Sequence, residues 1–147
     1  MVRTFLISLL LINYTSSLEK KAYKVIAKQY DTDFVLMEEI RVFPKDGVLY
    51  DVLTDKGPKG YAFIGTSRSR FDNFEYLALL DEDYSIVRVK ILVYREVYGG
   101  EVGSRKWLEQ FIGLKEPINR VSAISGATIS VNSLHYSINR LLRNLRE

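Results

Sequence analysis

Four runs rich in β-branched and aromatic residues follow one another through the middle of the chain, and they constrain its fold more than any other feature. They occupy residues 48–54, 61–67, 73–80 and 86–94. The connections between them are short and turn-forming, such as the acidic segment Asp81-Glu82-Asp83. Consecutive strands with short connections pair as neighbours, so the sequence predicts an antiparallel β meander.

The last of these runs indicates the polarity of the sheet. Valine and isoleucine alternate with charged residues along Val87, Arg88, Val89, Lys90, Ile91 and Val93. This alternation is typical of a strand that has one face in water and the other face on a core. A sheet covered on one face needs helices there, so the predicted fold class is α+β.

Helices are predicted before and after the meander. Residues 18–29 carry apolar side chains at helical spacing with lysines between them, and Ser104 caps a short helix after the last strand. The clearest helix spans 131–145, where apolar residues recur at steps of three and four. The apolar stretch 34–42 fits either a strand or a helix.

The first residues differ in character from the rest. Arg3 precedes an uncharged apolar run over 4–12, and residues 13–17 are small and polar. This pattern predicts a secretory signal peptide over 1–17. The apolar run is far shorter than the roughly 20 residues of a membrane-spanning helix, so no transmembrane anchor is expected. We therefore expect an exported protein, periplasmic or extracellular, with one domain over 18–147. The alternative is a buried or frayed N-terminal helix.

Composition argues against several classes of protein. Cysteine is absent, which removes disulfides, thiolate metal sites and cysteine nucleophiles. One histidine, His135, is too few for most histidine-built metal centres, and we interpret it as structural or exposed. The 21 basic and 18 acidic residues give a net charge of +3. The basic residues are scattered and no nucleic-acid motif accompanies them, so no nucleic-acid partner is expected.

The segment Ser125-Gly126-Ala127-Thr128 stands where the clearest helix begins. Free N–H groups and the positive end of the helix dipole favour an anionic phosphate at such a place. Gly126 lets the main chain approach a ligand closely, and the small Ala127 leaves room for it. Serine and threonine are also the residues that helix starts prefer, so a plain helix cap is the alternative.

The same segment resembles the flavinylation motif of the FMN-binding domain family, which includes flavin subunits of Rnf complexes and of sodium-translocating NADH:quinone reductases. In that family the threonine at the position of Thr128 is esterified to the FMN phosphate by a dedicated flavin transferase outside the cytoplasm. Gly60-Tyr61 opening a strand, and residues 94–100 followed by Trp107 and 110–113, resemble further parts of the family pattern.

The resemblance extends from about residue 48 to the C-terminus and implies FMN bound covalently through its phosphate to Thr128. The cofactor-binding residues that it implies are Thr128, Ser125, Gly126, Ala127, Glu96, Tyr98, Gly99, Gly100 and Tyr61. Trp107 and Phe111 are interpreted first as core residues and second as flavin contacts. The chain departs from the family at Ser122, where members usually have an aspartate, and at Val97-Tyr98, where many members have Thr-Pro.

An exported FMN protein with no nicotinamide fingerprint and no substrate-activating dyad fits an electron relay better than a complete enzyme. Its partners are then a flavin transferase for maturation and redox proteins that the sequence does not name. Two alternatives stay open. One is a secreted flavin-dependent reductase of a small acceptor, and the other is a non-redox α+β binding module whose Ser-Gly-Ala-Thr segment only caps a helix.

Overall fold

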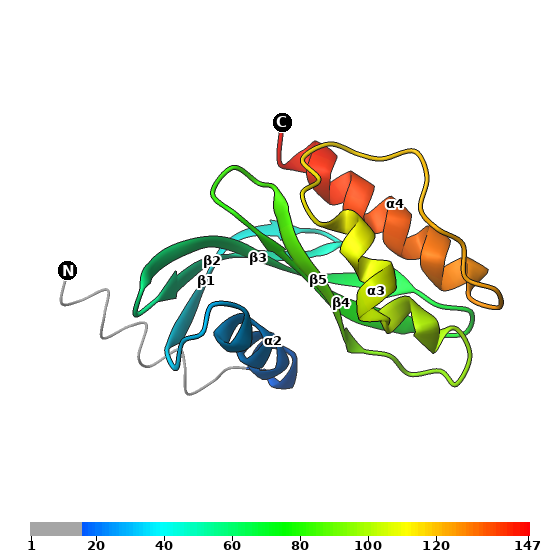
Figure 1. The fold of residues 1–147 in the computed structure, drawn as a ribbon, viewed down its shortest axis with the longest axis horizontal. Coiled ribbons are helices and arrows are strands. Elements are labelled where there is room, and N and C mark those ends of the chain that lie inside the picture. The colour runs from blue at the N-terminus through cyan, green and yellow to red at the C-terminus, as the bar shows by residue number, and fades with distance from the viewer. Residues whose placement is uncertain (1–15) are drawn as a thin grey trace.

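A computed structural model of the chain describes residues 16–147, drawn in colour in Figure 1. The predicted signal peptide over 1–17 therefore lies outside the described residues except for Ser16 and Ser17. The side chain of Ser16 caps the first described helix, because its hydroxyl accepts a hydrogen bond from the Glu19 N–H at 3.2 Å.

Five strands form one sheet in the order in which they occur along the chain, and each neighbouring pair is antiparallel. The strands are β1 (Val35–Phe43), β2 (Gly47–Thr54), β3 (Gly57–Arg68), β4 (Asn73–Leu80) and β5 (Ile86–Val93). The predicted antiparallel meander and the α+β class are confirmed. The ambiguous stretch 34–42 forms the edge strand β1, which pairs with β2 along most of its length.

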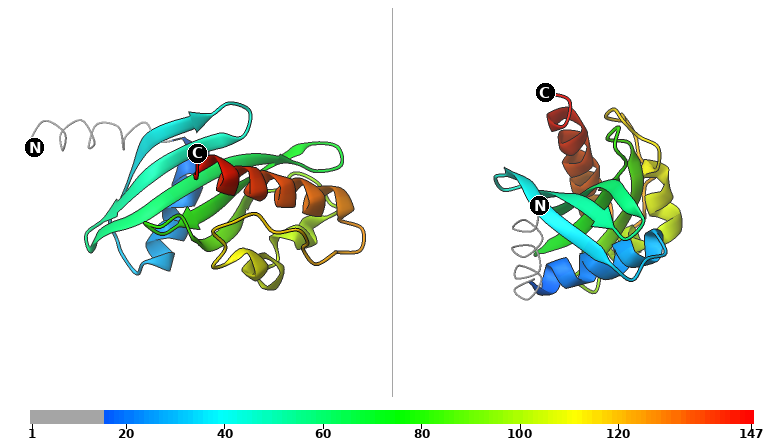
Figure 2. Two further views of the ribbon diagram at one scale, coloured as in Figure 1. Left: turned by 90° about the horizontal axis from the view of Figure 1, so that it is seen from above. Right: turned by 90° about the vertical axis from the view of Figure 1, so that its left-hand side faces the viewer.

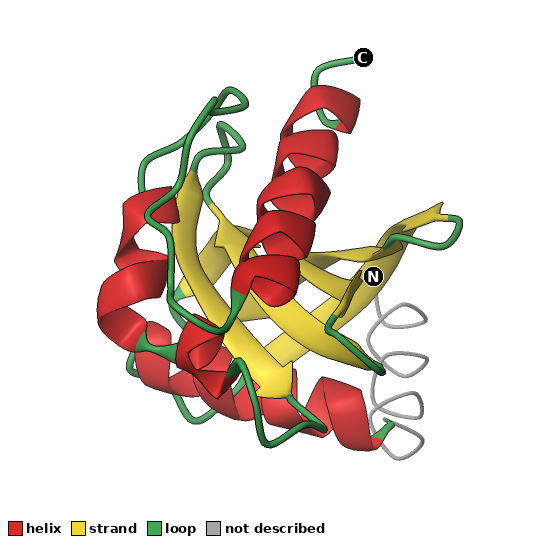
Figure 3. Cartoon of the chain, turned by 90° about the vertical axis from the view of Figure 1, so that its right-hand side faces the viewer, coloured by secondary structure: helices red, strands yellow, loops and turns green. Residues whose placement is uncertain are grey.

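Helices lie on both faces of this sheet, as the right-hand view of Figure 2 shows. The helices are α2 (Ser17–Gln29), α3 (Arg105–Leu108) and α4 (Thr128–Asn144), with short 3-10 turns η1 (Gly100–Gly103) and η2 (Glu109–Phe111) around α3. Helix α4 lies across one face of the sheet (Figure 3), and α2 lies on the opposite face.

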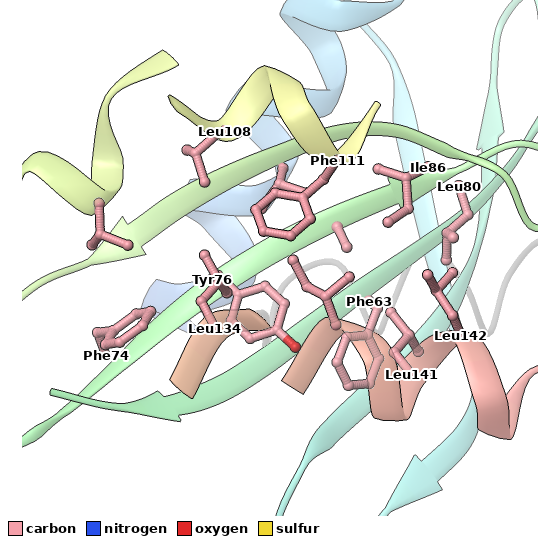
Figure 4. Packing of buried hydrophobic residues seen from close by; sticks show 14 of the residues in the cluster. Phe63, Phe74, Tyr76, Leu80, Ile86, Leu108, Phe111, Leu134, Leu141 and Leu142 are labelled. Atoms are coloured by element: carbon pink, nitrogen blue, oxygen red, sulfur yellow. The ribbon is translucent and has the colours of Figure 1, made fainter. Parts of the chain in front are cut away.

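Each face has its own apolar core. Beneath α3 and α4, side chains such as Phe74, Tyr76 and Phe111 pack with Leu134 of α4 (Figure 4). The hydroxyl of Tyr76 is buried in this cluster and pairs with Ser137 Oγ at 2.5 Å. Burial raises the pKa of Tyr76 above its ordinary value.

The second core lies under α2 and corrects the prediction that one face of the sheet is wet. Val87 and Leu92 of β5 pack toward α2, whereas Val89 and Ile91 pack toward the α4 core. The prediction fails because α2 covers the second face, and because the pairing of β4 with β5 shifts at two places, between Glu75 and Tyr76 and between Leu79 and Leu80. Such a bulge changes the face toward which successive side chains point, so apolar residues of β5 reach both cores.

The meander also determines which connections lie at the same end of the sheet. In an antiparallel sheet of consecutive strands, the β1–β2 turn, the β3–β4 loop and the end of β5 share one end of the sheet. Helix α4 begins at this end, where the Arg68 N–H donates to Ser133 Oγ at 2.6 Å and Tyr94 Oη lies 2.9 Å from Ser130 Oγ.

Candidate functional site

Helix α4 begins without a side-chain cap. Ala127 occupies the cap position, and it makes no side-chain hydrogen bond that caps the first turn. The Ala127 N–H closes a turn onto Ile124 O at 3.1 Å, and Gly126 within that turn has a left-handed φ of 81°. The interpretation of Ser125 and Thr128 as plain helix caps is therefore wrong.

The first N–H bonded within the helix is that of Val131, which donates to Ala127 O at 2.9 Å. The N–H groups of Thr128, Ile129 and Ser130 precede it, at the end of the helix where the dipole is positive. The side chain of Thr128 is exposed at this end, whereas Ser130 is only 3% exposed. An anion that approaches this end meets the Thr128 hydroxyl and the free N–H groups together.

A loop after β5 is attached to this first turn through Tyr94. The Tyr94 hydroxyl donates to Tyr98 O at 2.8 Å and pairs with Ser130 Oγ at 2.9 Å. Gly99 follows with a left-handed φ of 82°, and a Cβ there would lie 2.6 Å from Tyr94 Oη. Glycine is required at this position by both the backbone conformation and the contact.

Between this loop and α4 lies an open hollow of about 440 Å³. We call it the Thr128 hollow; it is lined by Arg70, Tyr94, Tyr98, Gly99, Gly126, Ala127, Thr128, Ile129 and Ser130. Two large apolar side chains next in sequence to lining residues are exposed, namely Phe71 (77% exposed) and Val97 (92% exposed). Arg70 supplies a cation and lies 5.0 Å from the centre of the Phe71 ring. Apolar walls with a few convergent polar groups are typical of a cofactor site.

Glu96 connects the two loops beside this hollow. Its Oε1 accepts a hydrogen bond from the Phe71 N–H at 2.9 Å, which joins the β3–β4 loop to the loop after β5. Its Oε2 is buried and has no hydrogen-bond partner among the described residues. A buried carboxylate oxygen without a partner is costly, which makes this position unusual.

Most of the residues predicted for the site come together at this hollow. Gly126, Ala127, Thr128, Tyr98 and Gly99 all line it. Ser125 is exposed just before α4 and does not line the hollow.

Gly100 does not contribute in the way that was expected. It begins η1, its φ is not left-handed, and a Cβ at this position would have open space around it. The close backbone approach belongs to Gly99 instead.

Tyr61 is the one predicted residue that the fold separates from the others. It pairs with Leu80 near the start of β3, and its ring stacks on Tyr84 with centroids 4.7 Å apart. Ser67, which contacts α4, lies six residues further along the strand, about 20 Å away. A Gly-Tyr dipeptide at a strand start does not indicate which end of a sheet it will occupy, and the fold does not bring Tyr61 to the Thr128 hollow.

Two side chains behind the site have the structural roles that were predicted. His135 Nε2 lies 2.7 Å from Ile118 O and holds the segment before α4 against the helix. Trp107 packs edge-on against Phe111 in the core, with ring centroids 5.5 Å apart. Its indole N–H donates to Ser122 O at 2.6 Å, so Ser122 is fixed by its backbone while its side chain is exposed.

Sequence reasoning missed Arg70, Phe71 and Ile129. The first two belong to the β3–β4 loop, which the sequence analysis left as a connection between strands. The basic and aromatic run Arg68-Ser69-Arg70-Phe71 was the available signal, because loops at strand ends often carry binding residues.

The hollow combines a cation with an uncapped helix end, and both favour an anionic group such as a phosphate. Comparison with known families agrees: the model of the FMN-binding domain matches residues 74–143, from β4 to the last turn of α4. Residues 74–143 therefore match the FMN-binding domain family, which is the family that the resemblance predicted. The matched range includes the loop 96–100 and the segment 125–128 but not Gly60-Tyr61, so it is narrower than the resemblance suggested.

A search of curated proteins returned no match to the chain. Within residues 16–147, no helix combines the length and the apolar character that crossing a membrane requires.

Proposed function

We propose that this chain is an electron-transfer flavoprotein in which FMN is esterified through its phosphate to Thr128. The observation that carries the proposal is the exposed hydroxyl of Thr128 in the uncapped first turn of α4, on the wall of the hollow that also contains Arg70. A phosphate at this position gains from the helix dipole, from the free N–H groups and from a nearby guanidinium.

The surroundings of the three nearby hydroxyls support Thr128 as the acceptor. Ser130 is buried and its Oγ pairs with Tyr94, so a transferase has no access to it. Ser125 is exposed but lies outside the hollow. Thr128 alone combines exposure with a place on the wall.

Forming the ester needs a flavin donor whose phosphate carries a leaving group, such as a flavin dinucleotide. The Thr128 hydroxyl oxygen would bond to phosphorus as the diphosphate bond breaks. A nucleoside monophosphate and the hydroxyl proton would depart.

The residues around the hollow then have separate tasks. Arg70 and the N–H groups of the first turn hold the phosphate, and Tyr98 and Phe71 offer apolar surface to the ring. Glu96 offers its unpartnered oxygen to a ring N–H, which would fix the orientation of the ring. Bound FMN supplies one- and two-electron transfer, and the protein supplies its position and its electrostatic surroundings.

The test is co-expression of the full chain with a flavin transferase, followed by denaturing electrophoresis under ultraviolet light and peptide mass spectrometry. The wild-type band should fluoresce, and the added mass should map to the peptide that contains Thr128. Thr128→Ala should lose the label and stay folded, because an exposed side chain that makes no cap changes stability by about 0.5 kcal/mol or less.

Thr128→Ser is the matched control, since it keeps the hydroxyl and should keep the label. A fluorescent Thr128→Ala band, or a label on Ser125, would contradict the choice of acceptor. Flavin that binds the wild type and leaves on denaturation would contradict the ester and leave the flavin-binding assignment intact.

A further inference from the structure

A second hollow, of about 410 Å³, adjoins the same end of the sheet and has a different chemistry. We call it the basic hollow; it is lined by Lys45, Thr66, Ser67, Arg68, Asn73, Ser133, Tyr136 and Arg140. Every one of these side chains can donate a hydrogen bond. None of them is apolar, which sets this surface apart from the Thr128 hollow.

The charge of the basic hollow is strongly one-sided. Lys45, Arg68 and Arg140 supply three cations to its lining, and the lining contains no carboxylate. The acidic side chain that reaches it is Asp46, whose Oδ1 accepts from Arg140 at 2.8 Å. One carboxylate against three cations leaves a net charge of about +2, which a dianion would balance.

Several of these groups are already held in place. Asp46 fixes the Arg140 guanidinium, and the Ser67 and Ser133 hydroxyls bond to each other across the floor. Lys45 sits in the β1–β2 turn with a left-handed φ of 69°, and this turn is tied to β3 by the bond from the Thr66 N–H to Asp46 O at 2.9 Å. Donors fixed in advance lose little conformational entropy when an anion binds.

The shape of the surface favours a small ligand over a protein. The donors converge on one concavity from four segments, namely the β1–β2 turn, the end of β3, the start of β4 and α4. Arg68 and Arg140 have planar guanidinium groups, which can donate two parallel hydrogen bonds to a carboxylate or a phosphate. Tyr136 is exposed at the rim.

We propose that the basic hollow binds a small organic dianion that carries carboxylate or phosphate groups. The site needs no flavin, so it is independent of the proposed function. Its position still matters, because Ile129 of the Thr128 hollow lies one helical turn before Ser133 of the basic hollow. A dianion bound here would lie beside the proposed flavin and share helix α4 with it.

The experiment is isothermal titration of the full chain with malonate and with inorganic phosphate, using acetate as the monoanionic control. Malonate or phosphate should bind with one-to-one stoichiometry, and acetate should bind at least tenfold more weakly because it balances one charge instead of two. Affinity should fall as sodium chloride is raised. The tighter of the two dianions identifies the preferred group.

Three variants locate the site. Arg68→Gln should weaken binding about tenfold or more, since it removes one charge and the hydrogen bonds that the guanidinium donates to the anion. Lys45→Gly should weaken it similarly while suiting the left-handed backbone, which guards against a loss that comes only from misfolding. Lys115→Gln removes the same charge from an exposed loop outside the hollow and should change nothing.

Absence of saturable binding by either dianion would overturn the proposal, as would an equal loss in Lys115→Gln. Tighter binding of a polyglutamate peptide with no binding of malonate or phosphate would also overturn it, in favour of an acidic protein partner. The titration is repeated on chain loaded with FMN. Unchanged affinity is expected, and loss of dianion binding on loading would show that the basic hollow belongs to the flavin.

Discussion

Replacing Gly99 by alanine tests how the loop after β5 is fixed to α4. Two separate costs are expected. The left-handed φ of 82° disfavours any residue with a Cβ by about 1–2 kcal/mol. The new Cβ would also lie 2.6 Å from Tyr94 Oη, closer than real Cβ contacts come, so the Tyr94 ring must shift.

The second cost follows from the hydrogen bonds that the Tyr94 hydroxyl would lose. Its bonds to Tyr98 O and Ser130 Oγ contribute about 1 kcal/mol each, so their combined loss costs about 2 kcal/mol. Gly99→Ala should therefore destabilise the protein by about 3–4 kcal/mol in total. In a Tyr94→Phe background the clashing oxygen is absent, and only the backbone cost of about 1–2 kcal/mol should remain. The expected coupling between the two sites is about 2 kcal/mol.

The assay is urea unfolding of the wild type, the two single variants and the double variant, followed by circular dichroism. Gly113→Ala is the matched control, because Gly113 has a similar φ of 87° with open space where the Cβ would go. It should lose only the backbone cost. Equal effects of Gly99→Ala in both backgrounds, or an effect no larger than that of Gly113→Ala, would refute the role assigned to the Tyr94 hydroxyl.

Three further predictions concern other parts of the chain. Burial raises the pKa of Tyr76, so the stability that its neutral phenol contributes is fully present below about pH 10 and is lost as pH rises further. Between pH 9 and pH 12 the Tyr76→Phe variant should lose less stability than the wild type loses. Urea midpoints measured across that range would test this. Ser122→Asp restores the family's aspartate on an exposed side chain, so it should raise the labelled fraction measured by flavin absorbance per protein while stability stays within about 0.5 kcal/mol. Secreted protein should lack residues 1–17 on N-terminal sequencing, and an intact Met1 would contradict the signal peptide.

The strands were predictable because their signals are local. Strand β4 has the bounds predicted from its apolar run, since Asn73 follows a polar loop and Asp81 begins a turn. The bulge opposite Leu79 and Leu80 was not predictable, because nothing in the sequence of β5 alone reveals how its partner is registered. The error about the wet face arose because β5 was interpreted alone, whereas α2 covers the second face over apolar residues of several strands.

The candidate site was likewise predictable only in part. Thr128, Gly126 and Ala127 were found because they are consecutive and stand at a helix start. Arg70 was missed because its nearness to Thr128 depends on contacts between residues far apart in sequence. The distance of Tyr61 from the Thr128 hollow was not predictable for the same reason, since the family pattern describes a dipeptide and not its position in a sheet.

The meander explains why both hollows occur at one end of the molecule. In a sheet of five consecutive antiparallel strands, the first and third connections and the end of the last strand meet at the same end. Lys45 lies in the first of these connections, Arg70 in the third, and Tyr94 directly after β5. Helix α4 runs across this end and contributes a wall to each hollow. Arg68 and Arg70 are two residues apart in sequence and line different hollows, so the end of β3 and the loop after it contribute one cation to each hollow.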